Sequence, residues 1–579
     1  MSDTPLPLTG QIALRIQNTF ASLYPGIIVK PPRVKQCDNP AFGDYQSEFA
    51  LSVSKLVKRN PMEVAQALID AFPDKTLFEK IEAIKPGFIN ITLKNAYLET
   101  QAASLSRANS LLAGGSLSGK TCVIDYSSPN VAKTMHIGHF RATIVGDALC
   151  RLLKAAGARV ISDNHIGDWG TQFGKLISAY GRWKDDAAYA ADPIQELERL
   201  YQKFEKEKTE ALEEEARAEL VKLQRGDPEN RKLWEEFLAL SLREFNSIYA
   251  RLGVTFDRTL GESFYNGMLS DVVKALLEKG IAVRDQGAVI VDTDARYKIH
   301  GPIIVEKKDG GHGYAATDLA TIKYRTGEWN PDLIVYVTDA RQQDHFRSVF
   351  AVADEWLGKA PQKIHVYFGS IKASDGRNFS SREGNVVKLL GLINEAVDRA
   401  RKVVDEKNPQ LPEAEKAGIA DAVGLGALKY TELNHDLRTD TIFDWNRMLA
   451  IEGNTAPYHL YTHARIKSVL RKYEAEVGAL PVDSRMIIRD SNERSLVMLI
   501  DGLSQQVESA AADLKPNYIA EYLFKLSGEF NSYYNRKDAP VLKEPDKAIR
   551  ESRVTLYALT GRTIKTCLEI LGIRALERM

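Results

Sequence analysis

The sequence predicts a multidomain α/β protein, in which a parallel-sheet domain lies between an α+β N-terminal domain and an all-α C-terminal bundle. Three observations support this fold class. At 579 residues the chain exceeds what one hydrophobic core usually supports. A strand, a helix and a second strand follow one another from residue 121. Beyond residue 455 the apolar residues recur at helical spacing, and strand signals are few.

Residues 1–113 form the first predicted domain. Short helical patterns alternate with extended runs such as "KPGFINITLK", which is typical of an α+β unit. The Ser- and Gly-rich stretch "RANSLLAGGSLSGK" that ends this region reads as a linker.

Residues 114–455 form the second predicted domain, which begins with the strand-like "TCVIDYS". In the helical run that follows, apolar residues recur every four positions, and Gly157 is well placed to end the helix. The run "ARVISDNHIG" then predicts a second strand, so the three segments form a βαβ unit of the Rossmann type.

Two further features complete the middle and the end of the chain. Residues 178–258 mix acidic and basic residues at helical spacing, which predicts a solvated helical insertion. Strand-like runs return in "GAVIVDT", "DLIVYVTD" and "KIHVYFGSI", so we expect one nucleotide-binding type of α/β domain split by insertions. Residues 456–579 are predicted to form the separate α-helical bundle.

Composition narrows the class of protein. Lys plus Arg and Asp plus Glu both total 77, so any nucleic acid must bind local patches rather than a generally basic surface. No basic start followed by an apolar run and no long uncharged apolar stretch occurs, which predicts a cytoplasmic protein without a membrane segment. The four cysteines show no CxxC pairing, so we expect no bound structural metal.

The stretch "SPNVAKTMHIGH" at 128–139 is the strongest candidate site. It follows the first strand and opens the first crossover helix, where parallel sheets bind ligands and helix N-termini attract phosphates. His136 and His139 can donate to phosphate oxygens, and Gly138 leaves room for an adenine or a ribose. The alternative is that the two histidines only cap a helix or bind a metal.

These residues carry a resemblance. "SSPNVAKTMHIGHFRATIVGDAL" followed by "NHIGDWGTQFGKLI" resembles the class I aminoacyl-tRNA synthetases, and within them the arginyl-tRNA synthetases of the bacterial type. The likeness extends over essentially the whole chain, in "VKQCDNPAFGDYQS", "KPGFINITL", "KKDGGHGYAATDLATIKYR", "FDWNRMLAIEGNTAPY" and "LGIRALERM".

The resemblance implies an activity and its partners. The N-terminal domain contacts the elbow of arginine tRNA, the middle domain is catalytic, and the bundle holds the anticodon. L-arginine attacks the α-phosphorus of ATP, with Mg²⁺ accompanying the nucleotide, and the arginyl group then passes to the 2′-hydroxyl of the terminal adenosine. In this family, activation itself depends on tRNA, and we expect a monomer.

Arginine recognition requires buried carboxylate, because bidentate acceptors hold a planar guanidinium best. Asp318 lies one helical turn after Tyr314, and Asp125 at the end of the first strand is a second candidate. Either could instead be an ordinary surface or strand-end aspartate. The resemblance implies that Tyr314 and Asp318 line the arginine pocket, and it adds four more residues: Ser128, Asn130, His139 and Gln342.

The second class I motif departs from the usual pattern. In "NFSSREGN" Asn378 and Ser381 replace both lysines of that motif. Family members with such loops tend to carry a lysine before the first motif, so Lys133 is predicted to act with His136 and His139 in catalysis. Arg377 and Arg382 remain alternatives. The resemblance further implies ATP contacts at Gly369, Ser380, Ser381 and Arg382, beside those at His136, Gly138 and His139.

The segment "EGNTAPYHLYTHARIKS" is the candidate contact to tRNA. Aromatic and basic side chains suit unstacked anticodon bases, which points to Tyr458, Tyr461 and Arg465, with His463 beside them. Ordinary helix packing is the alternative for each of them.

Two other functional classes are considered. A tRNA-independent adenylyltransferase would leave both flanking domains unexplained. A non-catalytic RNA-binding paralogue would have lost its active-site residues. Here only the changed loop at 378–382 favours that class.

Overall fold

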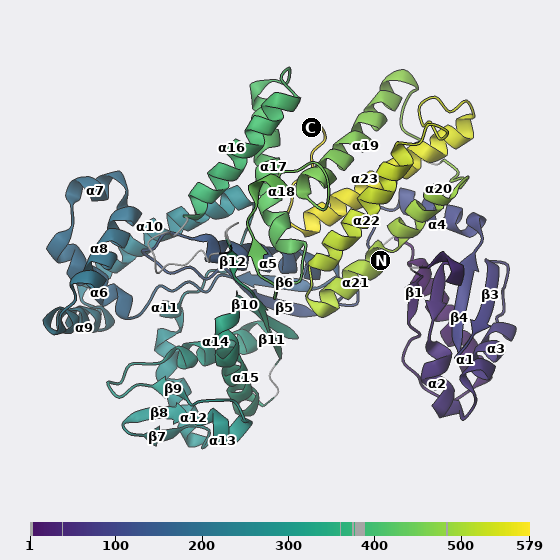
Figure 1. Cartoon of the computed structure of the whole chain (residues 1–579). Helices are drawn as coiled ribbons and strands as arrows, with labels where there is room; N and C mark the ends of the chain where they lie inside the picture. Colours follow the sequence, from purple (N-terminus) through teal and green to yellow (C-terminus); the bar gives the residue numbers. More distant parts are fainter. Residues whose placement is uncertain (1–3, 38, 359–360, 373–375, 377–387, 482–483) are drawn as a thin grey trace.

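The computed structural model describes residues 4–37, 39–358, 361–372, 376, 388–481 and 484–579. Figure 1 shows the N-terminal domain at the right and the helical insertion at the left, with the central sheet between them. One continuous apolar core joins the N-terminal domain, one face of the central sheet and the C-terminal bundle, while the insertion has a core of its own.

The N-terminal domain is a four-stranded antiparallel sheet with helices packed against it, which confirms its predicted α+β class. The strand order is β1 (Val34–Gln36), β2 (Tyr45–Ser47), β4 (Phe88–Leu93) and β3 (Phe78–Ile84), and the helices are α1 (Leu8–Leu23), α2 (Phe49–Val57) and α3 (Pro61–Asp70). Helix α4 (Asn95–Arg107) follows and packs against the C-terminal bundle.

The central sheet is parallel, as predicted. Its order is β11 (Gln362–Phe368), β10 (Leu333–Asp339), β5 (Thr121–Asp125) and β6 (Arg159–Asp163). Helix α5 (Ile137–Ala155) covers one face, and α14 (Tyr314–Trp329) and α15 (Gln343–Leu357) cover the other. Strand β5 has β6 on one side and β10 on the other, so the connections from these strands run in opposite directions. A topological switch point therefore lies at the carboxyl ends of β5 and β10.

The insertion is helical, as predicted, and begins somewhat earlier than the charge pattern indicated. Its helices are α6 (Thr171–Trp183), α7 (Asp186–Ala191), α8 (Pro193–Glu207), α9 (Glu210–Gln224) and α10 (Pro228–Leu252). The apolar face of α6 is buried against α8 and α9, while Lys175 pairs with Glu205 on α8 and Arg182 is exposed.

One strand differs from the expectation. The run "GAVIVDT" contributes β8 (Ala288–Val291) to a separate antiparallel sheet with β7 (Val283–Asp285) and β9 (Ile303–Glu306). Gln286 and Gly287 both have positive φ, 45° and 86°, which is the two-residue turn that ties β7 to β8 as a hairpin. Helices α11 (Glu262–Tyr265), α12 (Leu269–Glu278) and α13 (Thr293–Tyr297) accompany this sheet.

The C-terminal part is helical. Helices α16 (Leu389–Lys407), α17 (Glu413–Leu433) and α18 (Trp445–Met448) lead into it, beside the short parallel pair β12 (Ile371–Lys372) and β13 (Thr441–Ile442). The bundle itself contains α19 (Ala456–Glu476), α20 (Ser491–Asp501), α21 (Leu503–Asp513), α22 (Asn517–Tyr534) and α23 (Lys547–Ile570).

Candidate functional site

The loop between β5 and α5 is held in an unusual backbone conformation. Ser127, Ser128 and Ala132 all have positive φ, at 74°, 48° and 60°. Residues other than glycine adopt this region at a cost, and such residues concentrate at functional sites. The loop is fixed from the next segment, because Ser128 N donates to Asn164 Oδ1 at 3.0 Å and Gly167 N donates to Pro129 O at 3.0 Å.

His136 and His139 lie together at the N-terminus of α5, with stacked rings whose centroids are 3.9 Å apart. His136 caps the helix by accepting from Gly138 N at 3.1 Å through Nδ1, and His136 N donates to Nδ1 of His139 at 3.2 Å. The capping role considered from sequence is therefore real. A Cβ on Gly138 would lie 2.9 Å from the His136 ring, so the glycine also makes room for the stacked pair.

Both imidazoles are neutral hydrogen-bond donors at neutral pH. Burial lowers the pKa of His139 to about 3, and the nearby charges of His136 and Lys133 act in the same direction. Burial also lowers the pKa of His136, against the opposing charge of Glu198. Since Nδ1 of each ring accepts a backbone N–H, the ring proton resides on Nε2. The helix N-terminus thus presents two N–H donors to an anion.

Asp125 has partners within the protein. The fully buried Arg325 donates to Asp125 Oδ2 at 2.7 Å and to Asp163 Oδ2 at 2.8 Å, and Ser128 Oγ donates to Asp125 Oδ1 at 3.2 Å. Each oxygen of Asp125 thus accepts a hydrogen bond within the protein, and this carboxylate joins Arg325 to Ser128 at the carboxyl end of β5.

Asp318 lies in the first turns of α14, one turn beyond Tyr314, as the spacing indicated. Tyr314 is 79% exposed. Asp318 is partly buried, and its Oδ2 lies 2.6 Å from Nε2 of His345 on α15. Gln342, at the end of the 3₁₀ turn Ala340–Gln342, is exposed next to that helix. These residues border the carboxyl end of β10, beside the loop that precedes α5.

Lys133 contacts the helical insertion. Its Nζ lies 4.4 Å from the ring centroid of Tyr201 on α8, which is within cation–π range. The adjacent Thr134 donates to Glu198 Oε2 on the same helix at 2.6 Å. Burial lowers the pKa of Lys133, and the charges of Glu205 and Glu198 partly oppose that effect.

Most of the second predicted ATP segment lies outside the described residues, including Arg377, Asn378, Ser380, Ser381 and Arg382. Gly369, which precedes it, directly follows β11. On the far side of the segment, Lys388 forms an antiparallel bridge with His136, and Leu389 N donates to Met135 O at 2.9 Å.

Arg141 on α5 joins the same region to α17. Its buried guanidinium donates to the carbonyl oxygens of Gly369 and Thr439, at 2.9 and 3.0 Å, and its Nε lies 3.0 Å from Glu432 Oε2. It also donates to the carbonyls of Ser370 and Leu437. The helix that carries both histidines is thereby fixed to the segment that leaves β11.

The predicted tRNA-contact residues lie on α19. Arg465 is stacked between Tyr461 and Tyr534, with its guanidinium carbon 4.7 Å from each ring centroid, and both tyrosines are more than a third exposed. Tyr458 packs against Phe524, with ring centroids 6.0 Å apart. His463 is fully buried and hydrogen-bonded to Leu576 O, so ordinary packing accounts for it.

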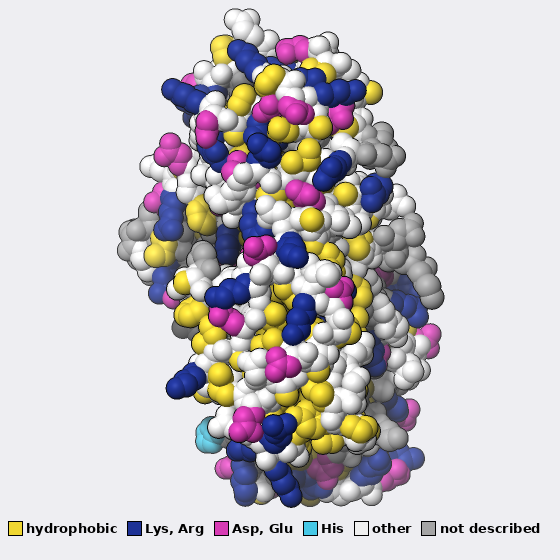
Figure 2. Space-filling view, turned by 90° about the vertical axis from the view of Figure 1, so that its right-hand side faces the viewer, with side chains coloured by type: hydrophobic (Ala, Val, Ile, Leu, Met, Phe, Trp, Pro, Cys, Tyr) yellow, Lys and Arg dark blue, Asp and Glu magenta, His cyan; other side chains and the backbone are white. Residues whose placement is uncertain are grey.

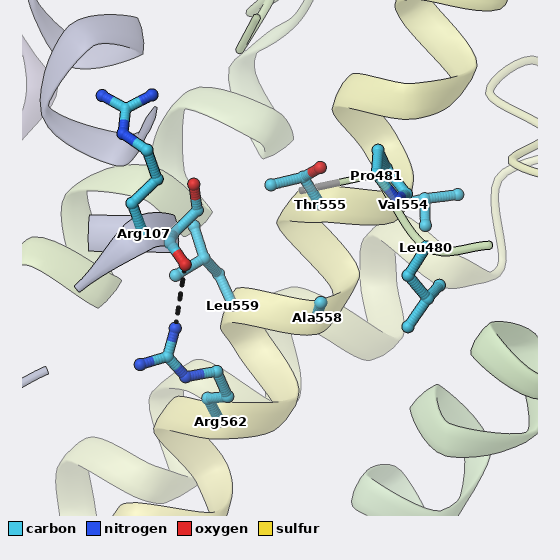
Figure 3. Close-up of a pocket in the computed structure, with 9 residues that line it drawn as sticks. Arg107, Leu480, Pro481, Val554, Thr555, Ala558, Leu559 and Arg562 are labelled. Atoms are coloured by element: carbon cyan, nitrogen blue, oxygen red, sulfur yellow. Dashed lines mark hydrogen bonds between the residues drawn. The ribbon is translucent and has the colours of Figure 1, made fainter. Parts of the chain in front are cut away.

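A cavity of about 430 Å³ lies between the end of α4, the segment at Leu480 and α23. Figure 3 shows Arg562 donating into the carboxyl end of α4, while the side chain of Arg107 points away from the apolar lining. The face of the molecule in Figure 2 intermixes Lys and Arg with Asp and Glu. Within the described ranges, no group of three or more His, Cys, Asp or Glu side chains is placed to hold a metal ion.

Several residues at these places escaped the sequence analysis. The partners of Arg325 and His345 depend on how α14 and α15 pack against the sheet, so the sequence did not indicate them. His345 is nevertheless only three residues after Gln342. Tyr201, which contacts Lys133, lies in the charged insertion that the sequence predicted to be solvated. Arg341, beside Gln342, adds a positive charge that helps to lower the pKa of His136.

Comparisons with known proteins cover nearly the whole chain. Residues 103–445 match the family model of the class I (R) tRNA synthetase catalytic domain, residues 459–579 the DALR anticodon binding domain, and residues 10–93 the arginyl tRNA synthetase N-terminal domain. The chain is 45% identical to the arginine–tRNA ligase of Fusobacterium nucleatum over 570 residues, covering 97% of this chain and 98% of the relative. It is 40% identical to that of Picosynechococcus over 562 residues, covering 95% of each.

Solved structures agree with this result. The crystal structure of arginyl-tRNA synthetase from Plasmodium falciparum is 27% identical, with a TM-score of 0.83 and full coverage of both chains. That from Thermus thermophilus is 25% identical, with a TM-score of 0.81 and coverage of 99% and 100%. Across the described ranges, none of the helices combines the length and the apolar character needed to cross a membrane.

Proposed function

Because the chain belongs to the family of arginyl-tRNA synthetases, we propose that it joins L-arginine to arginine tRNA in two steps at the carboxyl edge of its central sheet. In the first step the carboxylate of arginine attacks the α-phosphorus of ATP, and pyrophosphate leaves. In the second step the 2′-hydroxyl of the terminal adenosine attacks the arginyl carbonyl carbon, its proton is lost, and AMP leaves.

The stacked pair of neutral imidazoles at the N-terminus of α5 is the observation that supports this proposal best. The Nε2–H groups of His136 and His139 and the free N–H groups of the helix can hold the phosphates of ATP, with Gly138 between them. Negative charge shifts toward the leaving pyrophosphate during the reaction. Fixed donors at that place stabilise the transition state without rearrangement.

Lys133 is the proposed cation at the phosphates, in place of the two lysines absent from the second motif. Lys133 precedes His136 by three residues, and its charge helps to lower the pKa of His136. Gly369, Ser380, Ser381 and Arg382 stay proposed ATP contacts from the resemblance alone. Mg²⁺ would arrive as part of the nucleotide substrate, because this ion keeps phosphate and water ligands in preference to an all-protein cage.

Asp318 is the proposed carboxylate for the guanidinium of arginine. Its Oδ2 is held by His345, which leaves Oδ1 as the acceptor nearest to an incoming ligand. Tyr314, Gln342, Ser128, Asn130 and His139 complete the proposed pocket. Asp125 stays the second proposed carboxylate, although its oxygens already accept hydrogen bonds from Arg325 and Ser128.

The flanking domains are the proposed tRNA platform. The N-terminal domain would contact the tRNA elbow, and the bundle would bind the anticodon through Tyr458, Tyr461 and Arg465. The exposed stack of Tyr461, Arg465 and Tyr534 favours this, since aromatic and guanidinium planes suit unstacked bases. We expect the active unit to be a cytoplasmic monomer, and a solution mass of two chains would contradict that.

The decisive experiment is ATP–pyrophosphate exchange with each of the twenty amino acids, with and without total tRNA. We expect arginine to be the only amino acid of the twenty that supports exchange, and we expect this exchange to require tRNA. Exchange with another amino acid would overturn the proposed substrate. Strong arginine-dependent exchange without RNA would overturn only the dependence on tRNA, and charging of tRNA without any exchange activity would contradict the two-step route.

A further inference from the structure

His345 and Asp318 form a hydrogen-bonded pair across two helices at the proposed arginine pocket. His345 Nε2 lies 2.6 Å from Asp318 Oδ2, and both side chains are partly exposed, at 31% and 20%. A carboxylate can only accept, so Nε2 carries the proton in this bond. Nδ1 is then the position where His345 gains or loses its second proton.

The surroundings of the pair set its charge. On the β11 side His345 faces His365, whose pKa burial lowers to about 4, so that neighbour is neutral. Asp318 faces Glu262 on α11 and Tyr336 on β10. Burial acts to lower the pKa of His345, but the hydrogen bond and the charge of Asp318 outweigh it and raise the pKa above the ordinary value. When His345 carries both ring protons, its imidazolium offsets the negative charge of Asp318.

We propose that His345 is a proton-linked positioning residue for arginine: it holds Asp318 through Nε2–H and releases the proton on Nδ1 to solvent when the substrate guanidinium reaches the same carboxylate. This inference rests on the proposed role of Asp318. Two cations at one carboxylate repel each other, so binding of the second favours deprotonation of the first. The bond from Nε2–H survives this change, and Asp318 stays in place.

The direction of the pH dependence follows. Below the pKa of His345 the pair is neutral, and above it the pair carries one negative charge. Arginine keeps its guanidinium charge throughout, so its affinity should increase as pH rises through the pKa of His345. By linkage, arginine binding must release a proton in the same range. A histidine that served only to pack α15 on α14 would give neither effect.

The test is calorimetric titration of the full chain with L-arginine between about pH 5.5 and pH 8, in buffers of different ionisation enthalpy. In the wild type, Kd should fall as pH rises through the pKa of His345, with release of a fraction of a proton over the same range. His345→Gln keeps an N–H donor but no titratable group, so it should bind arginine with a flat pH profile and no such release. His345→Ala should bind at least about tenfold more weakly at every pH, because Asp318 loses its support.

Two further variants separate the possible outcomes. His300→Gln removes an exposed histidine outside the pocket and should behave like the wild type. Asp318→Asn should weaken arginine binding; if it does not, the proposed role of Asp318 fails together with this inference. If Asp318→Asn weakens binding while His345→Gln keeps the pH dependence and proton release of the wild type, only the role of His345 is overturned.

Discussion

Lys133 combines a catalytic assignment with a contact that the sequence did not indicate. Its ammonium lies over Tyr201 of the insertion, 4.4 Å from the ring centroid, and not in open solvent. The aromatic face attracts the cation without cancelling its charge, as a carboxylate at hydrogen-bond distance would. Lys133 is thus held near the start of α5, where its proposed role is to bind a phosphate of ATP.

Lys133→Ala is expected to slow adenylate formation about 100-fold to 1000-fold, because one charge-assisted contact to the phosphates is lost at the transition state. The KM for arginine should barely change. Lys203→Ala is the matched control, since Lys203 on α8 makes a similar contact with Trp183 at the end of α6, with 4.8 Å between its Nζ and the ring centroid. Single-turnover adenylate formation measures the effect. Normal turnover of Lys133→Ala together with crippled Arg377→Ala or Arg382→Ala would assign the charge to the loop.

Asp318→Asn addresses substrate recognition at the same scale. It removes the charge that the proposed guanidinium contact requires. We therefore expect kcat/KM for arginine to fall by the equivalent of about 2 to 5 kcal/mol, with ATP binding nearly intact. Asp344→Asn, which removes an exposed carboxylate from α15, should have little effect. The KM for arginine and the turnover in tRNA-dependent exchange provide the measurement. Values close to wild type for Asp318→Asn would leave this residue a structural role only.

At the scale of elements, α5 is fixed from two sides. Its N-terminus presents the histidines, and one turn later Arg141 reaches four carbonyl oxygens and Glu432. Burial raises the pKa of Glu432 to about 7, against the lowering effect of Arg141. The arginine thus satisfies acceptors from three separate segments that would otherwise be buried without partners.

Arg141→Ala is expected to destabilise the protein by about 3 to 5 kcal/mol, because it leaves Glu432 and several carbonyls buried and unpaired. Lys154→Ala removes an exposed cation from the same helix and should cost less than about 1 kcal/mol. The free energy of unfolding in urea distinguishes the two. Similar values for both variants would show that the Arg141 contacts do not stabilise the fold.

Local sequence patterns predicted the helices and strands better than the contacts between residues far apart in the chain. The βαβ unit, its glycine stop at Gly157 and the helical insertion follow from spacing and charge within short windows, and all three are present. The pairing of Asp125 with Arg325 joins residues 200 positions apart, and no local pattern records it. The same holds for His345, whose partner lies on another helix. The run that forms β8 was expected in the central sheet but lies in a separate one, because alternation of apolar and polar residues indicates a strand and not the sheet that the strand joins.

At the scale of the whole molecule, the N-terminal domain is attached to the C-terminal bundle by polar contacts. Asp501 at the end of α20 is buried and accepts from Leu8 N at 2.8 Å and from Gln101 Nε2 at 2.7 Å. Arg494 and Asp44 form an ion pair at 2.6 Å across the same junction. The two proposed tRNA-binding parts therefore sit on one continuous support.

The stability of this junction should depend on pH. Burial raises the pKa of Asp501 to about 7, despite the N–H groups that favour its ionised form. An unfolded aspartate titrates near about 4, so the folded state holds more protons between these values and the free energy of unfolding falls as pH rises from about 4 to about 7. Asp501→Asn should flatten this part of the profile. Urea midpoints of both proteins at about pH 5 and pH 8 provide the test, and equal slopes would contradict it.

The strand order of the central sheet also has a consequence during synthesis. Strands β5 and β10 are neighbours, yet the insertion and the small sheet stand between them in the chain. At 5 to 20 residues per second, a ribosome makes the roughly 200 intervening residues in roughly 10 to 40 s, and for that time one edge of β5 has no partner. The insertion has its own apolar core and can fold meanwhile, which shortens the loop that must close. The nascent nucleotide site therefore stays half-built until β10 has emerged.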